Sequence, residues 1–387
     1  MAGIFLSIFV FSFIVVLVCH YVFPKRFNWL ETGIMFGVSL LFGGILVAIV
    51  SWAAMSDIDI LNGKVTGKEM ERVSCSHSYE CNCYTTTDSK GNSTRHCSTC
   101  YEHPYDQDWN VDTTVGEITI DRVDRQGLIE PRRWSSVMIG EPASRSERVT
   151  NYVLASPNSL FHNNEFSDDA AKWGKWLPAY HDTYDYYRYD HVYNMGVPLK
   201  EVNAYNDGMA KMLRDLGASK QVNINVVFAP TDDREYKNAL ERHWLGGKKN
   251  DVIVVIGAKN YPKIDFADAF TFARSSHNEM LALKLQEDIE AVGDLTKVDD
   301  VLNVINTDVA KNFNREHMSK YEYLKEDYVP SGWTLFWCGL FYLIVLIGMI
   351  AFFWYNDVTT DGVYSNRFRS IDNRSYFSNN NPYRRNR

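Results

Sequence analysis

The chain has 387 residues, of which 45% are hydrophobic and 23% charged, and it carries a net charge of −8 at pH 7. This length leaves room for two or three domains, since one domain usually takes about 100–200 residues. Both ends of the chain are basic, so the negative charge falls between them, and an acidic central region argues against nucleic acid as a partner.

Two apolar runs open the chain, residues 3–23 and 30–54. Each is long enough to span a bilayer, which needs about 20 apolar residues. Nothing basic precedes the first run, as it would in a cleaved signal peptide. We therefore expect residues 1–55 to form two transmembrane helices, joined by a short basic loop that contains Lys25 and Arg26.

A GIMFG sequence places Gly33 and Gly37 one helical turn apart in the second run. This GxxxG spacing permits two helices to approach closely in a membrane. We expect these glycines to pack the second span against the first, with the joining of subunits in a homo-oligomer as the alternative. No span has a charge in its interior, which disfavours an ion or proton pathway.

Residues 56–160 alternate short apolar runs with turn signals and are expected to be β-rich. Within them, YTTTDSKGNSTRH is typical of a β-hairpin. A three-residue turn with Gly91 in the left-handed position would pair Cys83 with Cys97. Directly opposed residues are close enough for a disulfide. We therefore predict a Cys83–Cys97 bond.

Three further cysteines flank this hairpin. We expect a second bond from Cys81 or Cys75 to Cys100, because thiols outside the cytoplasm tend to oxidise. The alternative is zinc, with nearby histidines as further ligands, although a CxC pair departs from the usual two CxxC knuckles. Those histidines are His77, His96 and His103. The unpaired cysteine would be free, bonded to another subunit or a metal ligand.

Asn92 opens the sequon Asn-Ser-Thr at the hairpin tip, and glycosylation there depends on the host. Residues 161–196 follow as an aromatic-rich connection, including AYHDTYDYYRYDHVY. Such a stretch could bind carbohydrate or peptide. Packing over a neighbouring sheet, with the hydroxyls hydrogen-bonded, is the favoured interpretation.

Residues 197–330 alternate helices with strands and predict an α/β sandwich. A helix that ends at Gly217 precedes the strand QVNINVVFA, and a second helix precedes the central strand DVIVVIGA. KIDFADAFTFA is expected to form a third strand, and two helices follow at about 276–291 and 297–313.

A third apolar run, residues 331–355, is the last expected span, and an Asn/Arg-rich tail, 356–387, follows it. With three spans, the tail and the first basic loop fall on the same side of the membrane. Basic segments favour the cytoplasmic side. We therefore expect an integral membrane protein with its N-terminus and large central segment outside the cytoplasm.

The order of elements from residue 197 to 355, together with WLGGKKNDVIVVIG at residues 244–257, resembles the TPM-domain family. The resemblance implies an extracytoplasmic α/β fold tethered by the adjacent span. The chain departs from the family pattern because KIDFADAFTFARSS has no glycine, and because two N-terminal spans replace a cleavable signal. Some family members are phosphatases or bind divalent cations.

Clustered carboxylates at strand ends are the candidate cation ligands that this resemblance implies. Carboxylate oxygens suit Ca²⁺ or Mg²⁺. The candidates are Asp232, Asp233, Asp251, Asp265 and Asp268. A helix N-cap at Asp233 and solvated turns elsewhere are the alternative roles. No nucleophile elbow, HExxH sequence, Walker loop or dinucleotide fingerprint is present.

Together these patterns predict an α+β membrane protein with three transmembrane helices, in which a β-rich cysteine module and a TPM-like α/β sandwich share one extracytoplasmic segment. Splayed carboxylates would favour a membrane-anchored binding or assembly protein that contacts other envelope or membrane proteins, which is our preferred hypothesis. Convergence of Asp232, Asp251 and Asp265 in one pocket would favour a membrane-tethered, metal-dependent phosphatase.

Overall fold

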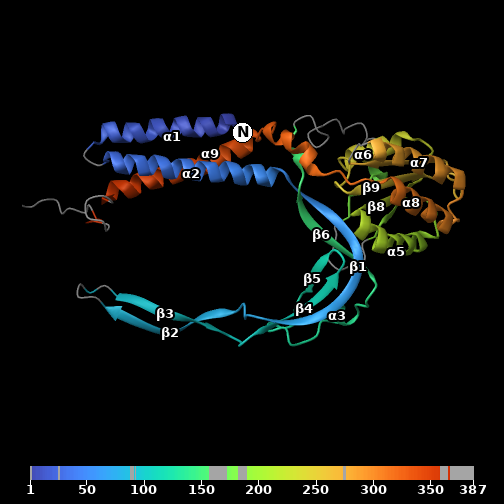
Figure 1. Cartoon of the computed structure of the whole chain (residues 1–387), viewed down its shortest axis with the longest axis horizontal. Coiled ribbons are helices and arrows are strands. Elements are labelled where there is room, and N and C mark those ends of the chain that lie inside the picture. The colour runs from blue at the N-terminus through green and yellow to red at the C-terminus, as the bar shows by residue number, and fades with distance from the viewer. Residues whose placement is uncertain are drawn as a thin grey trace, which may run out of the picture. The chain divides into compact units, whose positions relative to one another are not determined.

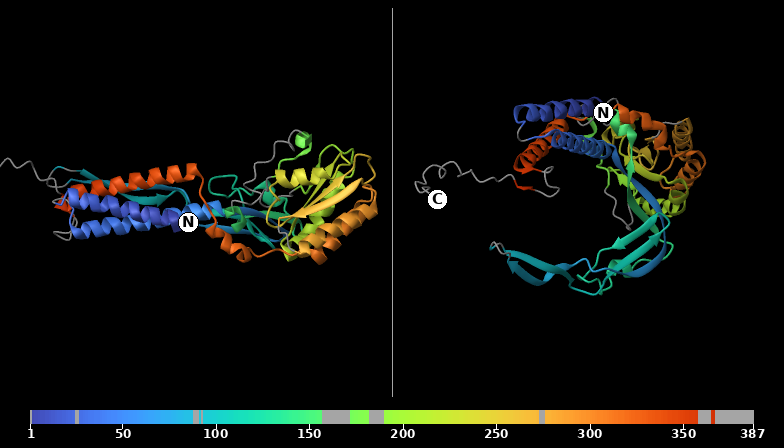
Figure 2. Two further views of the ribbon diagram at one scale, coloured as in Figure 1. Left: turned by 90° about the horizontal axis from the view of Figure 1, so that it is seen from above. Right: turned by 60° about the vertical axis from the view of Figure 1, so that its left-hand side comes forward.

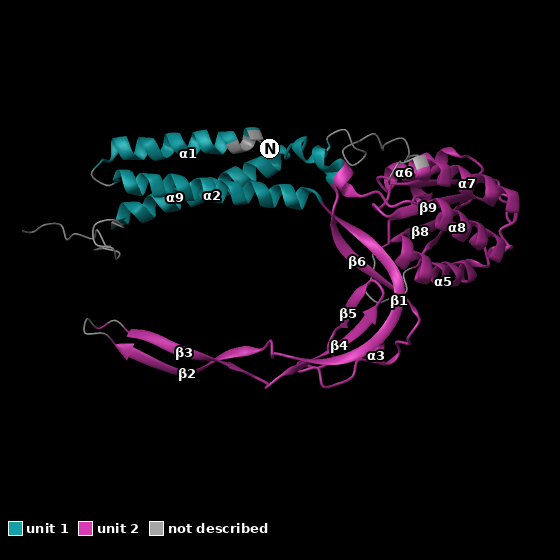
Figure 3. Ribbon diagram, in the orientation of Figure 1, with its two compact units in different colours: residues 1–55, 152–157, 321–387 teal, residues 56–151, 158–320 magenta. Residues whose placement is uncertain are grey.

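The computed structural model describes residues 2–24, 27–87, 91, 93–156, 172–181, 190–272, 276–357 and 365–366. The chain divides into two compact units (Figure 3), which are described separately. Unit 1 comprises residues 1–55, 152–157 and 321–387, and unit 2 comprises residues 56–151 and 158–320. Lys25, Arg26, the sequon residue Asn92 and the tail arginines lie outside the described residues.

Unit 1 contains three apolar helices that lie side by side (Figures 1 and 2): α1 (Ala2–Val22), α2 (Trp29–Ala54) and α9 (Gly332–Tyr355). A capping box starts α2, in which Asn28 Oδ1 accepts the Glu31 N–H at 2.8 Å and Glu31 accepts the Asn28 N–H at 3.2 Å. The Ser331 hydroxyl accepts the Thr334 N–H at 3.2 Å and starts α9.

Two of the described helices, α2 and α9, are long and apolar enough to cross a membrane. The apolar stretch Leu6–Val22 of α1 is shorter. The structure thus supports two of the three expected spans by length and composition.

The GxxxG pair does not pack the helices of unit 1 together as expected. A Cβ atom added at Gly33 or Gly37 would have no described heavy atom within 4 Å, whereas one at Gly43 would lie 2.7 Å from Ile8 Cγ2. Gly43 follows Gly37 by six residues, which is about 240° around an α-helix, so it lies on a different face. That face is the one that meets α1.

A polar link also joins the three helices of unit 1. The hydroxyls of Ser12 and Tyr342 are hydrogen-bonded, and Tyr342 donates to the Ser39 carbonyl at 3.3 Å. Hydrogen bonds of this kind stabilise helix association where the surroundings are apolar.

Unit 2 begins with an antiparallel sheet of strand order β5-β4-β1-β6. Its strands are β1 (Ser56–Val73), β4 (Asp106–Thr113), β5 (Gly116–Ile120) and β6 (Pro142–Thr150), with the short helix α3 (Arg132–Ser135) beside them. The first half of β1 pairs with β6 and the second half with β4. Trp109 and Val111 pack with Val65 in the small core.

The second sheet of unit 2 has the order β10-β9-β8-β7, in which β7, β8 and β9 are parallel and β10 is antiparallel. The strands are β7 (Val192–Asn194), β8 (Asn223–Ala229), β9 (Asp251–Gly257) and β10 (Phe266–Thr271). Every residue of β8 and β9 is buried, as expected for parallel strands covered on both faces. The sheet starts before the expected boundary at residue 197, because β7 belongs to it.

Helices cover both faces of this sheet. Leu213 of α5 (Val202–Lys220), Leu285 of α7 (Ser276–Val292) and Ile305 of α8 (Val298–Asn312) share one apolar core. Leu240 of α6 (Glu235–His243) packs on the other face, with Trp173 and Tyr193 from the aromatic-rich connection. The described part of that connection therefore packs on the sheet, whereas residues 161–171 and 182–189 lie outside the described residues.

Gly217 does not end α5 as expected. The helix continues to Lys220 and ends at Gln221, which is left-handed with φ 54°. A Cβ atom at Gly217 would lie 2.7 Å from the Asn62 carbonyl oxygen, so the glycine allows α5 to approach β1. Its role is close packing within unit 2.

A buried ion cluster also ties β1 to the α/β part of unit 2. Asp59 on β1 contacts Arg315 Nη2 at 2.5 Å and Lys249 Nζ at 3.5 Å, and its side chain is fully buried. Burial raises the pKa of Asp59, while the two cations oppose that shift. Because these contacts join the β-rich segment to residues beyond 197, the two expected domains form one compact unit.

Candidate functional site

The five candidate carboxylates do not share one site. Asp251 opens β9 opposite Asn223, the first residue of β8, whereas Asp232 follows the last residue of β8. Because β8 and β9 are parallel, about 20 Å of strand separates the two positions. Asp265 precedes β10 at the same edge as Asp232, and Asp268 lies within β10.

Three of the candidates, Asp232, Asp233 and Asp265, are engaged by neighbouring donors. Asp232 accepts hydrogen bonds from Lys259 Nζ at 3.1 Å, and Asp265 accepts the Asn260 backbone N–H at 2.9 Å. Asp233 binds Lys172 Nζ at 2.7 Å and accepts the Glu235 N–H at 3.0 Å, so it caps α6 although Arg234 is the N-cap residue. Contacts of this kind are typical of surface turns and of a helix N-terminus.

Burial shifts the pKa of the two remaining candidates, Asp268 and Asp251. Burial raises the pKa of Asp268, whose Oδ1 accepts the Ala269 N–H at 2.8 Å. Asp251 is fully buried and accepts hydrogen bonds from Lys248 N–H at 2.7 Å, the Tyr180 hydroxyl at 2.8 Å and Asn223 Nδ2 at 2.8 Å. Burial is the main reason that its pKa rises to about 6.

Asp251 holds together the loop that carries the WLGG sequence. Leu245, Gly246 and Gly247 after α6 all have positive φ, at 53°, 82° and 82°. Glycine adopts this conformation without strain. The chain thereby turns back so that the Lys248 N–H meets the Asp251 carboxylate. The motif on which the family resemblance depends thus has a structural role in this chain.

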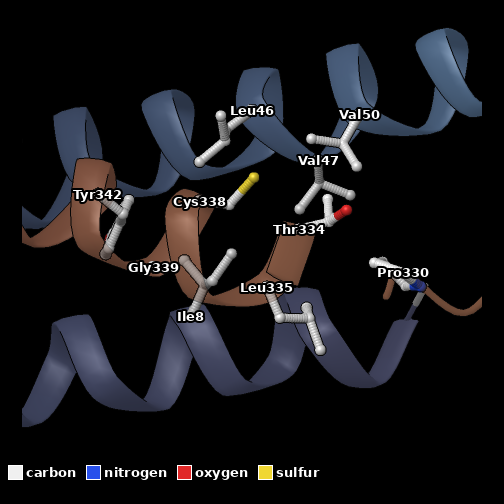
Figure 4. A pocket seen from close by; sticks show the side chains of 10 residues that line it. All are labelled: Ile8, Leu46, Val47, Val50, Pro330, Thr334, Leu335, Cys338, Gly339 and Tyr342. Carbon is white, nitrogen blue, oxygen red and sulfur yellow. The ribbon is translucent and has the colours of Figure 1, made fainter. Parts of the chain in front are cut away.

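Several hollows are present among the described residues, including a groove in unit 2 and an apolar cavity in unit 1. A groove of about 580 Å³ in unit 2 is lined in part by His181, His243 and Lys248. A smaller apolar cavity of about 120 Å³ lies between α1, α2 and α9 of unit 1 (Figure 4), with Ile8, Val47 and Cys338 among its lining residues. Neither hollow is lined by any of the five candidate carboxylates.

The expected hairpin consists of β2 (Ser78–Thr87) and β3 (Ser93–Tyr101), which pair with each other as a separate two-stranded sheet. No residue of either strand is buried. Tyr79, Tyr84 and Tyr101 are each more than half exposed. The ribbon therefore presents aromatic surface that the described part of the chain does not cover.

Two disulfides, Cys83–Cys97 and Cys81–Cys100, staple the hairpin. The first confirms the predicted register, and the second selects Cys81 as the partner of Cys100. A β-bulge between Cys81 and Tyr84, with Asn82 at φ 49°, adds one residue to β2. Side chains alternate between faces, so the bulge and the CxxC spacing of β3 put the two disulfides on opposite faces of the ribbon. The bulge therefore allows two cysteines with CxC spacing in β2 to form disulfides with two cysteines with CxxC spacing in β3.

Cys75, the fifth cysteine of unit 2, lies at the base of the hairpin beside three other side chains that can bind metal. One ligand atom from each of Cys75, His77, His103 and Asp106 lies within 4.8 Å of the others. Cys75 Sγ is 3.6 Å from His103 Nδ1, and His103 Nδ1 is 3.3 Å from Asp106 Oδ1. His77 Nδ1 is 3.6 Å from Asp106 Oδ2.

Pairing of β1 with β4 builds this cluster. Val73 ends β1 opposite Asp106, the first residue of β4, so the two loops that lead to the hairpin start side by side. The Ser76 backbone N–H and the Arg122 guanidinium donate to Asp106 Oδ2 at 2.9 and 2.7 Å and hold the pKa of Asp106 well below its usual range. The sequence drew attention to the cysteine and both histidines. Asp106 lies three residues after His103 but was missed, because only strand pairing brings it near Cys75 and His77.

Models of known protein families, curated protein sequences and solved structures were compared with this chain, and none of them matches.

Proposed function

We propose that the chain is a membrane-anchored binding or assembly protein of the cell envelope, and that the β2–β3 hairpin is its contact arm. The exposed, stapled hairpin is the observation that carries this proposal. An isolated two-stranded hairpin is marginally stable in water. The two disulfides therefore hold the shape of a ribbon whose residues are all at least partly exposed, and this ribbon has no apolar core to stabilise.

The partner is proposed to be another protein. Tyrosine is enriched in protein interfaces because its ring gives a large contact area and its hydroxyl a hydrogen bond. Tyr79 and Tyr84 lie on one face of the ribbon, according to the strand register, and Tyr84 stacks on His96 with ring centroids 5.3 Å apart. A second copy of the chain is the alternative partner.

The proposed topology has α1 as a third span and residues 56–330 outside the cytoplasm. Two disulfides support an oxidising location for the hairpin. The basic loop and basic tail support a cytoplasmic location for both of these segments. We also propose a TPM-like fold for residues 197–355, which the order α5, β8, α6, β9, β10, α7, α8 and α9 supports. The separation of the five carboxylates lends no support to a metal-dependent phosphatase.

A photo-crosslinking amino acid in place of Tyr79 tests the contact arm in intact cells that express the full chain. We expect a discrete adduct with a second protein or a second copy. The matched control is the same amino acid in place of Leu283, which is 56% exposed on α7. Equal labelling from both positions, or none from Tyr79, would exclude the hairpin as the contact arm.

Labelling with a membrane-impermeant thiol reagent tests the topology. A cysteine in place of the exposed Ser319 should react on intact cells, and one in place of Ser378 in the tail should react only after permeabilisation. The opposite result would reverse the proposed orientation.

A further inference from the structure

We infer that Cys75, His77, His103 and Asp106 form a zinc site that fixes the hairpin to the sheet β5-β4-β1-β6. This inference depends on the geometry of unit 2 alone and holds whether or not the hairpin is a contact arm. One thiolate, two imidazoles and one carboxylate are the ligand types that zinc takes in proteins. Such a set is too soft for Ca²⁺ or Mg²⁺, which prefer oxygen.

Two distances in the cluster match the edges of a tetrahedral zinc site, and all four ligand atoms lie within 4.8 Å of one another. With zinc–sulfur bonds of about 2.3 Å and zinc–nitrogen or zinc–oxygen bonds of about 2.1 Å, the tetrahedral edges are about 3.6 Å from sulfur to nitrogen and about 3.4 Å between the lighter atoms. The Cys75 Sγ–His103 Nδ1 separation is 3.6 Å, and the His103 Nδ1–Asp106 Oδ1 separation is 3.3 Å.

Hydrogen bonding alone accounts less well for the same cluster. A charged imidazole–carboxylate bond is usually about 2.7–2.9 Å long, and a separation of about 3.6 Å is no hydrogen bond. The two imidazole–carboxylate separations are 3.3 and 3.6 Å. The His103 Nδ1–Asp106 Oδ1 pair is therefore spaced as two ligands of one ion, whereas Oδ2, the oxygen 3.6 Å from His77, is bound by Ser76 and Arg122.

The surroundings also suit a structural metal. Asp106 is fully buried and Cys75 is 7% exposed, whereas the side chains of His77 and His103 are 26% and 24% exposed, so the site is closed to water on one side only. Arg122 and Ser76 bind Asp106 Oδ2 and leave Oδ1 directed at His103. Partners of this kind orient metal ligands and strengthen binding. Four protein ligands complete the tetrahedral coordination sphere of zinc, as in structural sites, whereas catalytic sites leave one position open.

The site does not compete with the disulfides. Cys81, Cys83, Cys97 and Cys100 are paired with one another, which leaves Cys75 as the thiol of unit 2. Its position between β1 and β2, together with Asp106 at the start of β4, means that zinc would join both loops at the base of the hairpin. The metal would set the direction in which the ribbon leaves the sheet.

Elemental analysis of the full chain tests the inference, with the protein purified in detergent without reductant or chelator. We expect about one zinc ion per chain. Cys75→Ser and His103→Gln should lose it, whereas the matched control His96→Gln, on the exposed ribbon, should retain it. An Arg122→Met substitution should weaken zinc binding by about 10–100-fold, because Asp106 loses the charged partner that orients it. Zinc that persists in both ligand variants would overturn the assignment.

Cobalt substitution of the wild-type protein keeps the test decisive if those variants fail to fold. Added Co²⁺ should give the spectrum of a tetrahedral ion with a thiolate charge-transfer band. Bound metal should also protect Cys75 from alkylation until a chelator removes it. Cys338→Ser, which changes a free cysteine of α9, should leave the spectrum unchanged. A wild-type chain that binds neither zinc nor cobalt, or that gives an octahedral spectrum without a thiolate band, would refute the zinc site.

Discussion

The β2–β3 hairpin and the β7–β10 sheet stabilise their strands in different ways. Every residue of β8 and β9 is buried, whereas no residue of β2 or β3 is. The sheet is stabilised by apolar burial, at about 25 cal/mol per Å² removed from water. The hairpin has no such core and is stabilised by covalent cross-links. A structure without a core can keep its whole surface available for contact.

Truncation in the sheet should have the largest effect. Ile253→Ala removes a fully buried side chain of β9 and should destabilise the full chain by about 2–5 kcal/mol. Tyr84→Ala in the ribbon removes more atoms but should change stability by less than about 0.5 kcal/mol. Denaturant titration in detergent, followed by tryptophan fluorescence, compares the two. Equal losses would contradict the contrast between the regions.

Removal of a cross-link should act on the hairpin alone. The double substitution Cys83→Ser and Cys97→Ser opens one of the two disulfides and should cost the hairpin about 2–4 kcal/mol. Trypsin should then cleave at the exposed Arg95, while hydrogen exchange in β8 and β9 stays unchanged. Protection of Arg95 in the variant would mean that contacts other than the disulfide hold the ribbon.

The buried carboxylate of Asp251 makes the stability of the sheet depend on pH. The folded-state pKa of Asp251 is about 6, above an ordinary value of about 3.9. Between about pH 4 and pH 6, the folded chain retains a proton that the unfolded chain releases, so stability falls as pH rises. The loss should total about 3 kcal/mol over this range.

Thermal unfolding at several pH values measures this dependence as the difference between wild type and Asp251→Asn. The amide does not titrate, so the advantage of wild type over the variant should shrink from pH 4 to pH 6. A difference that is constant across this range would refute the raised pKa of Asp251.

A substitution with a smaller effect tests whether α5 packs tightly against β1, the strand that leads to the hairpin. Gly217→Ala would place a Cβ atom 2.7 Å from the Asn62 carbonyl and should cost about 1–3 kcal/mol, measured by the same denaturant titration. Asn203→Ala on the exposed side of α5 is the control and should be neutral or slightly stabilising. A neutral Gly217→Ala would mean that α5 and β1 can separate without cost.

Local patterns in the sequence predict local structure well in this chain. The turn sequence DSKGN and the cysteine spacing were sufficient for the Cys83–Cys97 pair, because a hairpin register follows from its turn. The apolar run DVIVVIGA identified the buried strand β9, whereas QVNINVVFA, which alternates as a half-buried strand would, forms β8 and is buried at every position. In each case the residues that decide the structure are neighbours in the chain.

Features that depend on distant partners were harder to predict. A glycine at position 217 is typical of a helix end. It lies inside α5 instead, because a larger residue there would clash with Asn62. Gly33 and Gly37 have the spacing of a helix contact, but Gly43 meets the neighbouring helix. Asp232 and Asp251 both lie at strand ends, yet strand direction puts them at opposite edges. The direction of a strand and the residue that a side chain meets are decided only when the distant segments assemble.

The long strand β1 has a consequence for the order in which the protein folds during synthesis. Its Asp59 meets Arg315, which follows 256 residues later, and its Asn62 meets Asn223, 161 residues later. The ribosome therefore releases β1 long before the residues that neutralise and cover it. Contacts of such sequence separation slow folding and expose strand edges in the meantime. The hairpin β2–β3 closes within 24 residues and can form early, before β4, β5 and β6 complete the sheet that supports it.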